Sequence, residues 1–148
     1  MQTNEQLHSQ PAPQQKYQPE SQQKLLWSLF SLRLGVFIVM FVWTIDKFVN
    51  PAHSSKIFQY FYGVEGVSEN IIYLFGALQL VLVFAFLAGI KKRITYGLVF
   101  LLHAASTFSS YEKYLDIFNS LLFFAAWPML AACFALYLLR DEDTKFTV

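Results

Sequence analysis

Charged residues and cysteine are both scarce in this chain of 148 residues. Asp, Glu, Lys and Arg together make up 14% of it, whereas a soluble domain carries about 25%. The formal net charge is +1 and no basic stripe appears, so nothing predicts a nucleic-acid partner. The single cysteine, Cys133, excludes an internal disulfide and a two-thiol redox relay within the chain.

Motifs for tightly bound cofactors are also missing. No glycine-rich loop that would cradle a phosphate appears, so no nucleotide site is predicted. Cys133 has no neighbours of the metal-ligand type, and no cluster predicts a transition metal. His103 stands alone in its apolar segment, with His8 and His53 far from it in sequence, so two axial haem ligands are not available. We therefore predict no haem, metal or nucleotide.

Long apolar runs dominate what is present. Hydrophobic residues make up 55% of the chain, and 16 residues are Phe. A helix needs roughly 20 mainly apolar residues to cross a bilayer and closes its backbone hydrogen bonds internally. The runs of this kind cover residues 25–49, 71–90, 94–110 and 117–139. The sequence thus predicts an all-α fold, an integral membrane four-helix bundle over residues 25–139.

The remaining segments are more polar. Residues 1–24 are rich in Gln, Ser and Pro and lack the short apolar core of a signal peptide, which predicts a disordered tail. Residues 54–62 mix polar and aromatic side chains before Gly63, and we expect a short helix lying in the membrane interface. A lid over a site or a docking surface for a partner is the alternative for this segment. Residues 140–148 are expected to form a short polar C-terminal tail.

The distribution of basic residues predicts the orientation. With four crossings, eight Lys and Arg residues lie on one side and three on the other, so both termini are expected in the cytoplasm. The eight are Lys16, Lys24, Arg33, Lys91, Lys92, Arg93, Arg140 and Lys145, against Lys47, Lys56 and Lys113. Arg33 is expected to snorkel to the cytoplasmic headgroups. The run 91–93 is interpreted as a topology signal, with anionic-lipid binding as the alternative. A bacterial-type cytoplasmic membrane is the expected location.

Polar side chains inside the apolar runs indicate a candidate site, because such groups are costly in hydrocarbon. His103 lies about 14 Å, Gln79 about 12 Å and Pro128 about 16 Å from the starts of their spans, at about 1.5 Å per residue. All three positions fall near the midplane. Pro128 is expected to kink its helix there. A kink, a carboxamide and an imidazole at one depth predict a polar pocket inside the bundle.

Further residues extend this pocket toward the non-cytoplasmic side. Asp46 is expected to point into the bundle, and Lys47 to reach the outer interface. The predicted binding residues are Trp43, Asp46, Lys47, Gln79, His103, Thr107, Ser110 and Trp127. Such a pocket suits a quinone headgroup, which needs a few hydrogen bonds and flat apolar walls. The alternative is an inert structural network in which His103 bonds Gln79.

The first apolar run resembles the opening of DoxX-like membrane proteins. The resemblance lies in residues 32–37 (LRLGVF) and 41–51 (FVWTIDKFVNP), where an Arg begins the span and an aromatic-rich stretch ends in a lysine followed by a proline. The resemblance implies that the counterparts of that family's signature are Arg33, Trp43, Asp46 and Lys47. The resemblance implies a four-helix bundle in a family that includes small subunits of thiosulfate:quinone oxidoreductases.

These observations predict an accessory membrane subunit of a quinone-linked redox system, not an enzyme on its own. Its expected partners are membrane lipid and either another protein or a second copy of the chain, and quinone is the cofactor that the pocket suggests. A non-catalytic scaffold that meets its partner through the aromatic outer segment is the first alternative. A small-solute or proton carrier that uses Asp46 and His103 is the second.

Overall fold

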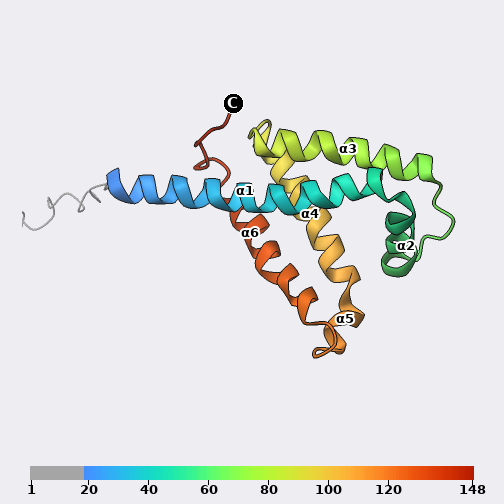
Figure 1. Ribbon diagram of the computed structural model, residues 1–148. Coiled ribbons are helices and arrows are strands. Elements are labelled where there is room, and N and C mark those ends of the chain that lie inside the picture. The colour runs from blue at the N-terminus through green and yellow to red at the C-terminus, as the bar shows by residue number, and fades with distance from the viewer. Residues whose placement is uncertain (1–18) are drawn as a thin grey trace, which may run out of the picture.

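The computed structural model describes residues 19–148, which are helical and contain no β-strand (Figure 1). The elements are α1 (Pro19–Val49), α2 (Pro51–Tyr62), α3 (Glu69–Leu87), α4 (Lys92–Ser109), α5 (Tyr111–Leu115), the 3₁₀ helix η1 (Leu121–Ala125) and α6 (Ala126–Leu138). The predicted all-α class is confirmed. Residues 1–18 of the predicted N-terminal tail lie outside the described residues.

Helix α1 begins six residues earlier than the apolar run suggested. Pro19 occupies its first position, where a missing N–H is tolerated. Glu20 then pairs with Lys24 one turn later at 2.8 Å, so residues 19–24 are helical. The helix has 31 residues, about 46 Å at 1.5 Å per residue, and is longer than a bilayer crossing needs. Its first turns extend past the other helices (Figure 1).

The chain turns sharply between α1 and α2. Asn50 is the N-cap of α2, and its side chain accepts a hydrogen bond from the His53 backbone N–H. Pro51 holds the first helical position, and Gly63 ends the helix at φ 66°, a left-handed conformation that suits glycine. The helix expected over residues 54–62 is therefore present and begins at Pro51.

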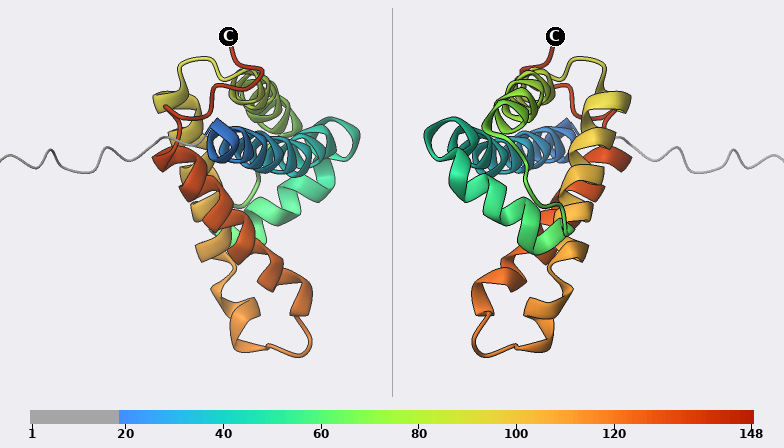
Figure 2. Two further views of the ribbon diagram at one scale, coloured as in Figure 1. Left: turned by 90° about the vertical axis from the view of Figure 1, so that its left-hand side faces the viewer. Right: turned by 90° about the vertical axis from the view of Figure 1, so that its right-hand side faces the viewer.

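The four long segments pack as two antiparallel pairs. Helix α1 lies beside α3, and α4 lies beside α6. The two pairs are steeply inclined to each other and meet where α1 contacts α6 and α3 contacts α4 (Figures 1 and 2). Helix α2 fills the wedge at one end and contacts α1, α3 and α4. The four predicted segments thus form a crossed arrangement in which each helix packs mainly on its pair partner and the two pairs meet at the crossing.

The core lies at this crossing. Its buried residues are Leu29, Val36, Met40, Val83, Phe86, Tyr96, Val99, Cys133 and Leu136. Away from it, large apolar side chains such as Leu74, Leu78 and Val81 of α3 are more than half exposed. A soluble monomer rarely exposes so much contiguous apolar surface, whereas hydrocarbon would cover it favourably.

Three helical segments are long and apolar enough to cross a membrane. They are Pro19–Val49, Glu69–Leu87 and Leu121–Leu138, the last of which joins η1 and α6. Helix α4, expected as the third crossing, is less apolar because it begins at Lys92 and Arg93 and carries an imidazole and several hydroxyls in its second half. The chain therefore has the composition of a membrane protein with three clear candidate spans.

Residues 140–148, named here the strap, differ from the predicted free polar tail. The strap folds back over α1 toward the α3–α4 turn, where the Val148 N–H donates to the Ala88 carbonyl at 3.0 Å (Figure 1). Asp143 of the strap is fully buried and pairs with Arg33. Arg33 is itself 0% exposed, so the expectation that it snorkels is wrong. A carboxylate supplied by the strap neutralises the guanidinium that headgroups were expected to solvate.

Candidate functional site

The clearest polar constellation lies at the corner between α1 and α2. The His53 Nδ1–H donates to Asp46 Oδ2 at 2.7 Å, and Ser54 Oγ donates to the same oxygen at 3.4 Å. The Asp46 side chain is 27% exposed and that of His53 is 46% exposed. A carboxylate on Nδ1 leaves Nε2 as the proton-accepting nitrogen of a neutral imidazole. The pair therefore presents a basic nitrogen at the surface of the corner.

Local backbone chemistry brings these two residues together. Asp46 lies in the last turn of α1, and its carbonyl accepts the Asn50 N–H at 2.7 Å as the helix ends. Asn50 and Pro51 then start α2 at once, so His53 occupies the first turn of the new helix, close to the end of the old one. A cap residue followed by proline thus places two side chains seven residues apart within hydrogen-bond distance.

A tryptophan flanks this pair. The Trp43 ring lies on that of His53 with centroids 6.3 Å apart and an interplanar angle of 21°, and about half of Trp43 is exposed. Lys47 does not join the pair, because its Nζ donates to the Trp43 carbonyl at 3.1 Å. The corner therefore combines the flat apolar ring of Trp43 with an imidazole that is hydrogen-bonded to a carboxylate. The Lys47 side chain bonds the backbone of α1 instead.

His103 lies in a different environment from the one expected. It bonds the Ala126 carbonyl of α6 at 3.0 Å, so the alternative in which it bonds Gln79 is wrong. The hydroxyls of Thr107 and Ser110 each donate to a carbonyl of their own helix, at 2.8 and 3.0 Å. Side chains bonded in this way are already satisfied. The polar side chains in this part of the chain therefore bond either the start of α6 or the backbone of α4.

The expected kink at Pro128 takes another form. A 3₁₀ helix, Leu121–Ala125, precedes α6, and Pro128 falls in the first turn of α6, where a missing N–H leaves no gap in the helix. Two helical segments thus follow one another where one kinked helix was predicted over residues 117–139. His103 bonds a carbonyl in this first turn.

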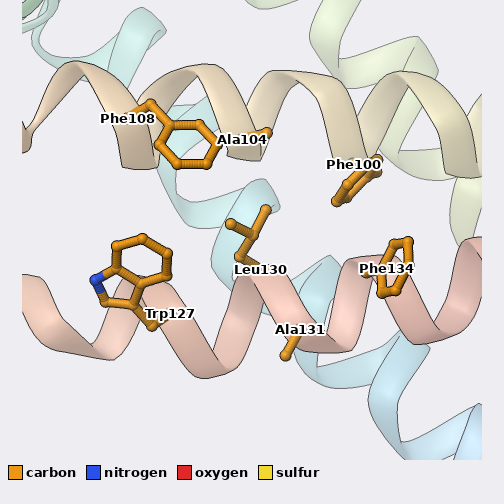
Figure 3. Close-up of a pocket in the computed structure, with 7 residues that line it drawn as sticks. All are labelled: Phe100, Ala104, Phe108, Trp127, Leu130, Ala131 and Phe134. Carbon is orange, nitrogen blue, oxygen red and sulfur yellow. The ribbon is translucent and has the colours of Figure 1, made fainter.

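Trp127 belongs to an apolar groove between α4 and α6 (Figure 3). The groove has a volume of about 300 Å³ and is lined by Phe100, Ala104, Phe108, Trp127, Leu130, Ala131 and Phe134. Phe108 faces Trp127 at one end, and Phe100 faces Phe134 at the other. The Tyr114 ring also packs on Trp127, with centroids 5.6 Å apart, and burial raises the pKa of the Tyr114 phenol. The groove can hold hydrocarbon but offers almost no hydrogen bonds.

The predicted site residues therefore fall into separate places. Trp43 and Asp46 meet at the α1–α2 corner, His103 and Thr107 belong to the α4–α6 contact, and Gln79 lies half-buried on α3. Helices α1 and α4 meet where Arg33 Nη1 donates to the Tyr96 hydroxyl at 3.2 Å, and no hydrogen bond within residues 19–148 joins the first two groups. The sequence reasoning missed His53 and Ser54. The Asn50-Pro51 signal for a new helix, which comes four residues after Asp46, could have indicated them.

Comparisons with protein-family models, with curated proteins and with solved structures returned no match. The resemblance of the first helix to DoxX-like proteins therefore stays a prediction from its residues. Within residues 19–148, no group of three or more His, Cys, Asp or Glu side chains is placed to hold a metal ion. The case for a function depends on the chemistry of the α1–α2 corner.

Proposed function

We propose that this chain is an accessory membrane subunit of a quinone-linked redox system, and that its α1–α2 corner accepts a proton from a quinol headgroup. The observation that carries the proposal is the 2.7 Å hydrogen bond between Asp46 and His53, which leaves the other imidazole nitrogen available as a base. The likeness of residues 32–37 and 41–51 to DoxX-like proteins supports the same class of system. The chain supplies a binding site, and the partner supplies the electron acceptor.

The chemistry of the corner suits a quinol. A quinol hydroxyl would donate its hydrogen to His53 Nε2, and the Asp46 carboxylate would stabilise the imidazolium that forms. The exposed Trp43 ring supplies a flat surface for the aromatic headgroup. As the partner removes the electrons, the proton passes from the headgroup to the imidazole and then to water, since the His53 side chain is 46% exposed.

The proposal includes four crossings with both termini in the cytoplasm, with α4 added to the three candidate spans. Its polar side chains have partners inside the protein: the Tyr96 hydroxyl donates to Asp143, and His103 bonds the Ala126 carbonyl. A satisfied polar group costs far less in hydrocarbon than an open one. With four crossings the α1–α2 corner lies at the non-cytoplasmic surface, at the depth of the interfacial aromatic residues of α2.

A quinone-binding titration tests this function. Purified protein in detergent is titrated with a short-chain benzoquinone while Trp fluorescence is followed. His53→Phe keeps a flat ring and removes both nitrogens, and Asp46→Asn removes the charge that supports the imidazole. Each is expected to weaken binding about tenfold, the equivalent of one lost hydrogen bond of about 1.4 kcal/mol. Unchanged binding in both variants would remove the proposal.

Ser110→Ala is the matched control for that titration. Ser110 caps the end of α4, and its hydroxyl donates to the Ser106 carbonyl of that helix at 3.0 Å, so it is already satisfied. We expect this variant to bind the quinone as the unaltered protein does. A general loss of binding in Ser110→Ala would mean that the assay reports folding rather than the corner.

A scaffold function is the second candidate, and the apolar surface favours it. Tyr60 of α2 is 59% exposed, its ring lies 4.8 Å from that of Phe61, and the α4–α6 groove is apolar throughout. Co-purification separates the two functions. A scaffold loses its partner in Tyr60→Ala and keeps it in His53→Phe, whereas the quinone subunit keeps its partner in both and loses quinone binding in the second.

A further inference from the structure

The strap places its acidic side chain among donors from two helices. Asp143 Oδ2 accepts hydrogen bonds from Arg33 Nη1 of α1 at 3.1 Å and from the Tyr96 hydroxyl of α4 at 2.8 Å. Lys92, at the start of α4, donates its Nζ to the Asp143 carbonyl at 2.6 Å. Arg33, Tyr96 and Asp143 are each at most 1% exposed. One carboxylate group thus fills an anion-binding pocket that the rest of the chain builds.

This pocket has binding capacity that the strap does not use. Within the described part of the chain, Arg33 Nε is buried without a hydrogen-bond partner, and Asp143 Oδ1 also has none, so the strap carboxylate is held through Oδ2 alone. Arg33 bonds the Asp143 carboxylate and Lys92 bonds the backbone carbonyl of the same residue, so two cationic side chains meet a single negative charge. A phosphate group offers more acceptor oxygens than a carboxylate and pairs well with the planar fork of an arginine. The pocket therefore matches a phosphate better than its present occupant.

The strap is attached in a way that permits release. Phe146 adopts φ 53°, a left-handed conformation that is uncommon for a bulky side chain and stores strain. Glu142, Thr144 and Phe146 are exposed. Because no helix depends on the strap for its own backbone hydrogen bonds, it can open without unfolding them.

Charge around the pocket indicates which phosphate source competes. The strap carries three consecutive acids, residues 141–143, and the α3–α4 turn carries three consecutive bases, residues 91–93. Lys91 and Arg93 are exposed beside the pocket residue Lys92. Juxtamembrane basic residues are attracted to anionic lipid surfaces. An anionic bilayer would therefore draw the turn toward itself and displace the acidic strap.

We propose that Arg33, Tyr96 and Lys92 form a binding site for the phosphate group of an anionic lipid, and that Asp143 of the strap occupies this site until such a lipid replaces it. The strap is then an internal competitor that couples the lipid composition of the membrane to the packing of α1 against α4. This inference is independent of the quinone function, since it concerns the opposite end of the helices.

Trp27 provides the readout for a test. Lys145 Nζ of the strap lies 3.9 Å from the centroid of its ring, and the Phe146 ring lies 6.3 Å away. With Trp43→Phe and Trp127→Phe, Trp27 is the remaining tryptophan of the three. The protein is placed in nanodiscs of phosphatidylcholine with increasing phosphatidic acid, and Trp27 emission is followed. We expect the emission to change as phosphatidic acid rises, and Asp143→Asn to need about tenfold less of it.

Two sets of variants separate the pocket from general attraction to an acidic surface. Lys92→Gln should weaken the response, and Lys91→Gln, its exposed neighbour, should alter it little. Ala88→Cys with Val148→Cys, made in Cys133→Ser, joins two residues that already share a backbone hydrogen bond. Oxidation should then lock the strap and abolish the response, and reduction should restore it.

The source of the phosphate is tested with soluble glycerol phosphate in discs of phosphatidylcholine alone. A response to phosphatidic acid and not to glycerol phosphate supports the lipid. An equal response to both keeps the site and overturns the lipid as its ligand. Two results would overturn the site itself. One is no change of Trp27 emission with phosphatidic acid in either the protein with Asp143 or the Asp143→Asn variant. The other is a full response to phosphatidic acid while the disulfide locks the strap.

Discussion

Replacing Asp143 by asparagine removes the charge that pairs with Arg33 and leaves the side chain almost the same size. Asp143 Oδ2 accepts hydrogen bonds from Arg33 and from Tyr96, and both members of the ion pair are 0% exposed. The change therefore leaves a guanidinium buried with only neutral acceptors, among them the carbonyls of Lys145 and Phe146.

The magnitude depends on whether the strap can move. Removing one partner of a buried ion pair costs about 3–5 kcal/mol when the other stays buried. That loss is expected when the disulfide between residues 88 and 148 holds the strap. Without the disulfide, the strap of Asp143→Asn opens, water reaches Arg33, and the loss of unfolding free energy is smaller than in the locked protein.

Loss of helical circular dichroism in a denaturing-detergent titration measures both unfolding free energies. Asp141→Asn is the control, because its carboxylate is 82% exposed and lies 3.7 Å from Arg140, and its stability should be unchanged. Equal stability of Asp143→Asn and the unaltered protein, with the strap locked and unlocked, would refute the view that the ion pair fastens the strap.

Two further predictions concern the packing of the helices. Gly76→Ala should lower the unfolding free energy by about 1–3 kcal/mol in the same titration, because its Cβ would lie 2.9 Å from the Phe48 ring; Gly35→Ala, with nothing within 4 Å, should not lower it. His103→Phe should cost about 0.5–1.5 kcal/mol, since the Ala126 carbonyl loses a hydrogen bond of 3.0 Å, and an unchanged stability would contradict that role.

The helices could be predicted from the sequence, because continuous apolar runs and local signals set them. The run 71–90 corresponds to α3, Glu69–Leu87, and Asn50, Pro51 and Gly63 mark the ends of α2 by their own backbone preferences. The start of α1 was placed too late, because residues 19–24 are polar and their helix is an extension outside the apolar run.

The contacts between distant segments could not be predicted in the same way. Depth along a helix axis says nothing of the direction in which the axes cross, so residues of equal depth, His103 and Gln79, were joined wrongly. Arg33 and Asp143 are 110 residues apart in the sequence. Three consecutive acidic residues, 141–143, predict an exposed segment, and no local signal indicates that the third of them is buried. The Asp46–His53 contact needed only the sharp turn at Asn50.

Photochemical labelling with an azidoquinone tests the central functional claim most directly. The protein in nanodiscs is irradiated with the labelled quinone, digested, and the modified peptide is identified by mass spectrometry. The account predicts that the label falls on the α1–α2 corner, between Trp43 and Ser54, and that unlabelled quinone competes it away. Label confined to the α4–α6 groove around Trp127, or spread evenly over the apolar surface, would contradict it.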